Sequence, residues 1–148
     1  MTTIATDGQS MAGDGQSQAN GTVVNHVRAK VLKLATGSIV GGCGCMYELG
    51  VWASWLEGGK VGDCPIQSEE FGGLILNPDG SVFMVDHRGR ESSVEVPCAV
   101  GTGMDLAIGA MMAGATPGEA VNIACKRDPN SGGRIKIEYL TTRLEEAA

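Results

Sequence analysis

The sequence predicts a single α+β domain in which helices lie outside two packed, mainly antiparallel sheets. Short β-prone segments are joined by turn signals such as Asp7-Gly8 and Asn77-Pro78-Asp79-Gly80, so most connections are hairpins. Apolar helical segments follow strands both in the middle and late in the chain, as expected for helix layers that cover sheets. A chain of 148 residues can bury one real core, so we place residues 1–148 in one domain.

The first half of the chain contains most of the expected strands. These strands cover residues 2–7, 11–16, 22–24, 28–34 and 38–42. The first two form a hairpin around Asp7-Gly8, which is a strong turn signal. A helix over residues 46–56 follows, because apolar residues recur at helical spacing from Met46 to Leu56. Residues 58–70 form a polar loop.

The second half begins with strands and then adds two helices. We expect a hairpin over 71–86, a strand over 94–100, helices over 104–115 and from 117 to about 126, and a last strand over 134–140. The helix over 104–115 is apolar nearly all round, which predicts packing on both sides. Thr116, Pro117 and Glu119 provide an N-cap, a first-turn proline and the third-position glutamate of a capping box.

Charge and hydropathy exclude several classes of function. The net charge of −6 is dispersed, which argues against a nucleic-acid-binding protein, because such a protein needs a basic face. No apolar run approaches the roughly 18 residues needed to span a bilayer, and the first residues lack the order of a signal peptide. We therefore expect no membrane association and a cytoplasmic location.

The cysteines indicate reduced thiols. They are Cys43, Cys45, Cys64, Cys98 and Cys125. Their number is odd and no export signal accompanies them, so buried structural thiols are the default. Cys43 and Cys45 suggest a metal site, but His26 and His87 are the only histidines and no Cys-x-x-Cys pair occurs. We expect neither a metal nor a cofactor.

The start of the chain offers the parts of a nucleophilic site. A threonine hydroxyl is a weak nucleophile unless a base lies beside it, and the α-amino group of the same residue can be that base. An α-amino pKa of about 7.7–8.0 suits this role. Thr2 has such an amine only if Met1 is removed. A lysine ammonium, such as that of Lys30, would lower the pKa of the amine, and a buried carboxylate, such as that of Asp14, would hold the lysine charged.

Two glycine-rich junctions complete the candidate site. Gly41-Gly42-Cys43-Gly44 joins a strand to a helix N-terminus, where N–H groups can stabilise an oxyanion. Gly101-Thr102-Gly103 repeats this arrangement before the next helix, and the Thr102 hydroxyl can orient the α-amine of Thr2.

These segments, in this order, resemble those of a known family. The segments are TTIATDGQSMAGDGQ, NHVRAKVLKL, SIVGGCG and AVGTGMDLAIGAMMAGATPGEAV. They are similar to those of HslV-like threonine peptidases, which belong with the proteasome β subunits to the N-terminal-nucleophile (Ntn) hydrolases. The resemblance extends from Thr2 to about Ala124. The chain is shorter than the family norm, mostly after the Thr116 helix, and Cys-Gly-Cys-Met-Tyr replaces the family's run of small residues.

The resemblance implies a role for each matched residue. Thr2 is the nucleophile, Asp14 the buried carboxylate, Lys30 the catalytic lysine, Gly44 the oxyanion glycine and Thr102 the hydroxyl beside the amine. Cys45 is the alternative to Gly44, since the local alignment can slip by one position. The implied fold is a four-layer αββα sandwich. The implied assembly is a homo-oligomer of stacked rings that degrades peptides or unfolded proteins delivered by an AAA+ ATPase.

Other interpretations of the same residues stay open. Thr2 and Thr3 are also good β-formers on an edge strand, Lys30 can belong to a solvated basic stripe, and Thr102 can be a helix N-cap. If Met1 is retained, Thr2 has no α-amine. The same fold then fits a catalytically silent assembly unit, for example in a ring, a shell or a phage-associated particle. A third possibility, an amidase for a small metabolite, shares the mechanism and differs in pocket shape.

Overall fold

The computed structural model of the chain describes residues 2–45 and 47–140. Its strands are β1 (Thr3–Thr6), β2 (Ser10–Gly13), β3 (Ser17–Ala19), β4 (Thr22–Asn25), β5 (Val31–Lys33), β6 (Ile39–Cys43), β7 (Gly72–Leu76), β8 (Val82–Val85), β9 (Glu91–Val94), β10 (Cys98–Gly101) and β11 (Lys136–Tyr139). Its helices are α1 (Glu48–Glu57), α2 (Met104–Met112) and α3 (Pro117–Cys125).

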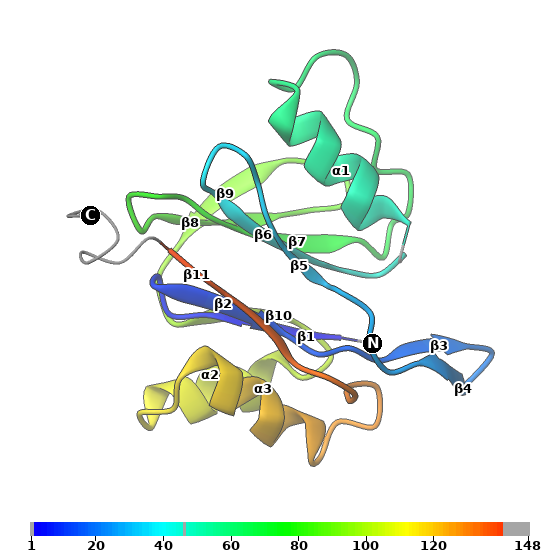
Figure 1. The fold of residues 1–148 in the computed structure, drawn as a ribbon, viewed down its shortest axis with the longest axis vertical. Coiled ribbons are helices and arrows are strands. Elements are labelled where there is room, and N and C mark those ends of the chain that lie inside the picture. The colour runs from blue at the N-terminus through cyan, green and yellow to red at the C-terminus, as the bar shows by residue number, and fades with distance from the viewer. Residues whose placement is uncertain (1, 46, 141–148) are drawn as a thin grey trace.

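The strands form two larger antiparallel sheets and a separate hairpin. One sheet has the order β10-β1-β2-β11, the other has the order β5-β6-β7-β8-β9, and β3 pairs with β4 alone. Figure 1 shows the two larger sheets facing each other, with α1 on the outer side of the five-stranded sheet and α2 and α3 on the outer side of the four-stranded sheet. The β3–β4 hairpin projects from one end of this arrangement. The expectation of a mixed fold with helices and antiparallel sheets is therefore confirmed.

Alternation along β1 and β2 explains how one sheet serves two cores. Ile4 and Met11 belong to the core between the sheets, whereas their neighbours Ala5 and Ala12 pack against α2 and α3. Successive side chains of a strand point to opposite faces, so large residues fill one side and small residues let the helices approach on the other. On the five-stranded sheet, buried Trp52 of α1 fills the outer core.

Several expected strands are shorter in the structure. The strand expected over 11–16 ends at Gly13, and the strand expected over 28–34 begins only at Val31. The intervening residues leave the sheets and bond to one another, since Arg28 N donates to Gly15 O at 2.9 Å. The strand expected over 94–100 is β10, which starts at Cys98.

The expectation that the helix over 104–115 packs on both sides is wrong. Of the residues in α2, only Ala107 and Met111 are buried, and Leu106 and Met112 are 41% and 72% exposed. One face packs on the sheet and on α3, while no described part of the chain covers the other. The start expected for the first helix, Met46, lies outside the described residues. Within the described part of the chain, no helix is both long and apolar enough to cross a bilayer.

Candidate active site

A buried ion pair lies between the two sheets at the start of β1. Lys30 Nζ is 3.0 Å from both carboxylate oxygens of Asp14. The Asp14 side chain is fully buried and that of Lys30 is 9% exposed. This burial rules out the alternative in which Lys30 belongs to a solvated stripe. A buried pair needs further hydrogen bonds to offset the cost of removing both charges from water.

Backbone N–H groups around Asp14 supply those bonds. Asp14 Oδ1 accepts from Thr3 N at 3.0 Å, and Oδ2 accepts from Gly132 N at 3.1 Å and from Gln16 N at 3.4 Å. The carboxylate therefore ties the first strand to the turn before β11. Asp14 can reach these groups because β2 ends at Gly13, which frees the next residues to turn inward.

Glycine at position 13 brings the two sheets together beside the ion pair. A Cβ at Gly13 would lie 2.8 Å from Ile4 Cδ1 and 2.9 Å from Val31 Cγ2, closer than carbon atoms can approach. Val31 directly follows Lys30, so this close contact fixes the position from which the lysine side chain extends. Gly42 N donates to Lys30 O at 3.2 Å and anchors the same residue to β6.

Thr2 lies directly against this ion pair. Lys30 Nζ donates to Thr2 Oγ1 at 3.1 Å, and Thr2 is only 3% exposed. Its backbone nitrogen donates to Thr102 Oγ1 at 3.3 Å. Gly101 allows this approach, because a Cβ there would lie only 2.0 Å from Thr2 O. The structure thus brings together Thr2, Asp14, Lys30 and Thr102. Met1, whose retention decides whether Thr2 has an α-amine, lies outside the described residues.

Thr102 does not cap α2. The N-cap of that helix is Gly103, which has no side-chain cap. The Thr102 hydroxyl instead lies 2.6 Å from Asp128 Oδ2, to which it donates. The Thr102 hydroxyl therefore accepts a hydrogen bond from Thr2 N and donates one to the Asp128 carboxylate.

Asp128 and Ser131 are site residues that our sequence reasoning missed. Ser131 Oγ donates to Asp128 Oδ2 at 2.6 Å and lies 2.7 Å from Thr3 Oγ1. Burial raises the pKa of Asp128, but the hydrogen bonds donated by Ser131 and Thr102 outweigh this effect and hold the pKa below its ordinary value. Asp128 is therefore a carboxylate at neutral pH. The segment Asp128-Pro129-Asn130-Ser131 reads as a turn, and no local signal distinguishes it from one.

Gly44 lines the same cavity as Thr2 and does not lie at the end of a helix. It follows β6 at φ +103°, and α1 begins four residues later at Glu48. A Cβ at Gly44 would lie 2.7 Å from Glu70 O, so only glycine fits this backbone. Gly44 and Cys45 both line a cavity of about 70 Å³ together with Thr2 and Lys30. The structure places both candidates for the oxyanion site in the same cavity wall.

The cysteines near the site are not arranged as metal ligands. Among residues 2–45 and 47–140, no three His, Cys, Asp or Glu side chains are grouped to hold a metal ion. Burial raises the pKa of the Cys43 thiol, and burial together with the carboxylates of Asp14 and Asp128 raises that of Cys125 to about 11. Both thiols are therefore protonated at neutral pH and are poor nucleophiles and poor metal ligands.

Comparison with known proteins identifies the fold. No family model matches the sequence, and no curated protein matches it. Among solved structures, the eukaryotic HslV from Trypanosoma brucei has a TM-score of 0.73 and 16% sequence identity, covering 95% of this chain and 99% of that one. The chain has an HslV-like fold.

Two further solved structures support this assignment. Thiobacillus denitrificans BPH has a TM-score of 0.66 and 18% identity over 95% of this chain and 98% of that one. The same protein in complex with epoxomicin has the same TM-score and identity, over 95% of this chain and 99% of that one. This chain and the BPH chain are each matched along nearly their full length, so the likeness covers the whole domain. At such identities it concerns the fold alone.

Proposed function

We propose that this chain is an N-terminal threonine hydrolase that cleaves peptide (amide) bonds. One observation carries the proposal: a lysine ammonium held by a buried carboxylate lies 3.1 Å from the Thr2 hydroxyl oxygen. We also propose that residues 1–148 form one four-layer αββα domain of the Ntn hydrolase family. The HslV-like fold supports this assignment.

The reaction requires that Thr2 be the first residue of the mature chain. Its α-amine then accepts the proton of its own hydroxyl while Oγ1 attacks a carbonyl carbon. Lys30 stabilises the developing alkoxide by charge and lowers the pKa of the amine, and Asp14 keeps Lys30 protonated. The Thr102 hydroxyl, oriented by Asp128, accepts a hydrogen bond from the amine and fixes its lone pair toward Oγ1.

The intermediate then collapses and is hydrolysed. Backbone N–H groups at Gly44 stabilise the tetrahedral oxyanion, with Cys45 as the neighbouring alternative. The protonated α-amine donates its proton to the leaving amine, which departs and leaves an ester on Thr2 Oγ1. Water, deprotonated by the same amine, attacks the ester and releases the acid product. No step uses a metal or a cofactor.

The partners that the proposal assigns are substrates and other copies of the chain. We propose peptides or unfolded proteins as substrates, a homo-oligomer of stacked rings as the assembly and an AAA+ unfoldase as the feeding ATPase. The uncovered face of α2, with exposed Leu106 and Met112, is available for contacts between copies. We also propose that epoxomicin, present in one BPH structure, binds this chain at Thr2.

The decisive test compares Thr2 variants of a chain whose first residue is confirmed by intact mass. Thr2→Ala is expected to abolish cleavage of fluorogenic peptides and the thermal shift caused by epoxomicin, with an unchanged circular dichroism spectrum. Thr2→Ser is the matched control, because it keeps both the hydroxyl and the amine. Unchanged turnover in Thr2→Ala would end the proposal. If purified wild-type protein retains Met1 and cleaves nothing, the catalytically silent assembly unit is the better interpretation.

A further inference from the structure

The cavity beside Thr2 is lined by basic and polar side chains. Lys30 and Arg28 both line it, together with the polar side chains of Gln16, Ser17 and Gln18. In the part of the chain that the structure describes, no Asp or Glu is among its lining residues. The carboxylate of Asp14, which pairs with Lys30, is fully buried and is not among the lining residues. The described lining of the cavity therefore includes two basic side chains and no acidic one.

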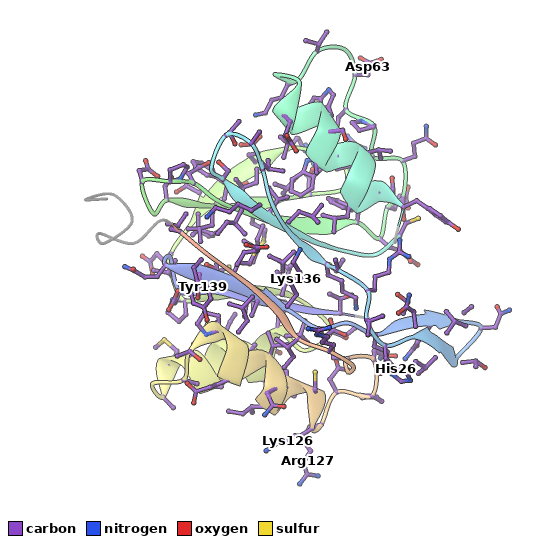
Figure 2. All side chains as sticks on the ribbon, viewed as in Figure 1. His26, Asp63, Lys126, Arg127, Lys136 and Tyr139 are labelled. Atoms are coloured by element: carbon purple, nitrogen blue, oxygen red, sulfur yellow. The ribbon has the colours of Figure 1, made fainter. Side chains whose placement is uncertain are left out.

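Arg28 is the cation of this wall that the proposed reaction does not use. Lys30 is engaged by Asp14 and Thr2, whereas no step requires Arg28. Arg28 and Lys30 both line the cavity beside Thr2. Arg28 also borders the neighbouring hollow that contains Arg134 and Lys136, so this residue lies where the two hollows adjoin. Figure 2 shows Lys136 on β11 and His26 near the base of the β3–β4 hairpin.

The backbone that carries Arg28 is fixed on both sides. Arg28 N donates to Gly15 O at 2.9 Å, and Arg134 N donates to His26 O at 2.7 Å. A Cβ at Gly15 would lie 2.6 Å from His26 O, so the two segments are in direct contact. A guanidinium held on such a backbone is partly preorganised, and its planar fork matches a carboxylate in two parallel hydrogen bonds.

We infer that the cavity selects substrates in which the residue supplying the attacked carbonyl has an acidic side chain, bound by Arg28. The inference rests on the proposed hydrolase function. The side chain of that residue is attached one carbon away from the carbonyl that Thr2 Oγ1 attacks, so it must enter the space beside Thr2. The substrate class is therefore a peptide with Glu or Asp before the cleaved bond.

The test measures kcat/KM for three fluorogenic peptides that differ only in that residue: Glu, Gln or Leu. Gln is the matched neutral analogue of Glu. Because a hydrogen bond to a charged group stabilises by about 1.5–3 kcal/mol, we expect the Glu peptide to be cleaved roughly ten- to a hundredfold faster than the Gln peptide. This ratio should fall as salt is added, because Arg28 is partly exposed.

Arg28 variants assign the preference to one side chain. Arg28→Gln is expected to bring the Glu-to-Gln ratio close to one. Arg28→Glu is expected to reverse the preference in favour of a Lys peptide. Arg134→Gln is the matched control, since Arg134 lines the neighbouring hollow but not the cavity of Thr2, and it should keep the wild-type ratio.

The outcomes separate the inference from the proposed function. A ratio near one in the wild type, faster cleavage of the Leu peptide, or a ratio that Arg28→Gln leaves unchanged overturns the inference and leaves the hydrolase intact. If a chain that begins at Thr2 cleaves none of the three peptides, the proposed function is overturned and the inference with it.

Discussion

Replacing Asp14 by Asn is expected to destabilise the fold more than replacing Lys30 by Met. In Lys30→Met the carboxylate loses its ammonium partner but keeps three backbone donors, at 3.0, 3.1 and 3.4 Å. In Asp14→Asn the ammonium stays buried with its carboxylate partner gone, and the new amide NH₂ faces backbone N–H groups. Breaking a buried pair costs about 3–5 kcal/mol. We expect Asp14→Asn to lower the free energy of unfolding by at least the top of this range. Lys30→Met should lower it by about 2–3 kcal/mol, because each hydrogen bond that the carboxylate retains still contributes.

Urea unfolding at a fixed protein concentration measures both free energies of unfolding. Fluorescence of Trp52, which is buried in the core under α1, reports the transition. The double variant Asp14→Asn with Lys30→Met completes a double-mutant cycle, and we expect it to be more stable than Asp14→Asn alone, because it removes the unpaired charge. If Lys30→Met is as destabilising as Asp14→Asn, the backbone donors do not support the carboxylate and our reasoning is wrong. Both single variants should lose peptide cleavage.

Three further predictions follow from local contacts. Gly44→Ala places a Cβ 2.7 Å from Glu70 O at φ +103°, so we expect a loss of about 1–3 kcal/mol in urea unfolding and reduced peptide turnover; wild-type values for both would contradict the placement of Gly44. Thr116→Ala removes the hydroxyl that accepts from Glu119 N, and with it half of the capping box. It should cost about 1 kcal/mol and lower the melting temperature by roughly 2–4 °C, with activity retained. Asp128→Asn tests how the stability of the fold decreases at acidic pH. The folded-state pKa lies below the ordinary 3.8, so the carboxylate stabilises the fold above that value and loses this contribution as the pH falls through the folded pKa. The variant should therefore be less stable at neutral pH and lose less stability below about pH 4, and parallel curves would exclude this role.

Short sequence motifs predicted the elements that are stabilised by contacts between residues close together in the chain. The turn at Asp7-Gly8 forms a hairpin, and the capping box at Thr116 and Glu119 starts α3 one residue later, at Pro117. Both devices are made of hydrogen bonds within a few residues, so the sequence contains all their partners. β9 (Glu91–Val94) was missed for the opposite reason: its residues are mostly polar and exposed, and only pairing with β8 makes them a strand.

The strands expected from the sequence are absent where backbone groups pair with distant loops. Residues 14–16 and 28–30 have the pattern of strands, but Gly15 bonds to Arg28 and to Gly132 instead of a sheet neighbour. The apolar sequence of α2 likewise predicted two packed faces, and the described part of the chain supplies only one. In both cases the missing information is tertiary or quaternary, and no window of sequence contains it.

The candidate site could be anticipated only in part. Thr2, Asp14 and Lys30 were found because their motifs occur in a recognisable order from the start of the chain. Asp128 and Ser131 were not, because short polar residues beside Pro and Gly are what any turn uses. Their involvement becomes visible only when the hydrogen bonds of Thr102 and Thr3 are traced to them.

The site draws on chain segments as much as 128 positions apart, as the bond between Thr3 and Ser131 shows. A growing polypeptide on the ribosome has no Asp128, no Ser131 and no closed pair of sheets until nearly all of it has been made. Nascent and half-folded copies therefore lack the buried environment around the Thr2 hydroxyl. If the proposed hydrolase function holds, neighbouring polypeptides are not cleaved until the chain has folded completely.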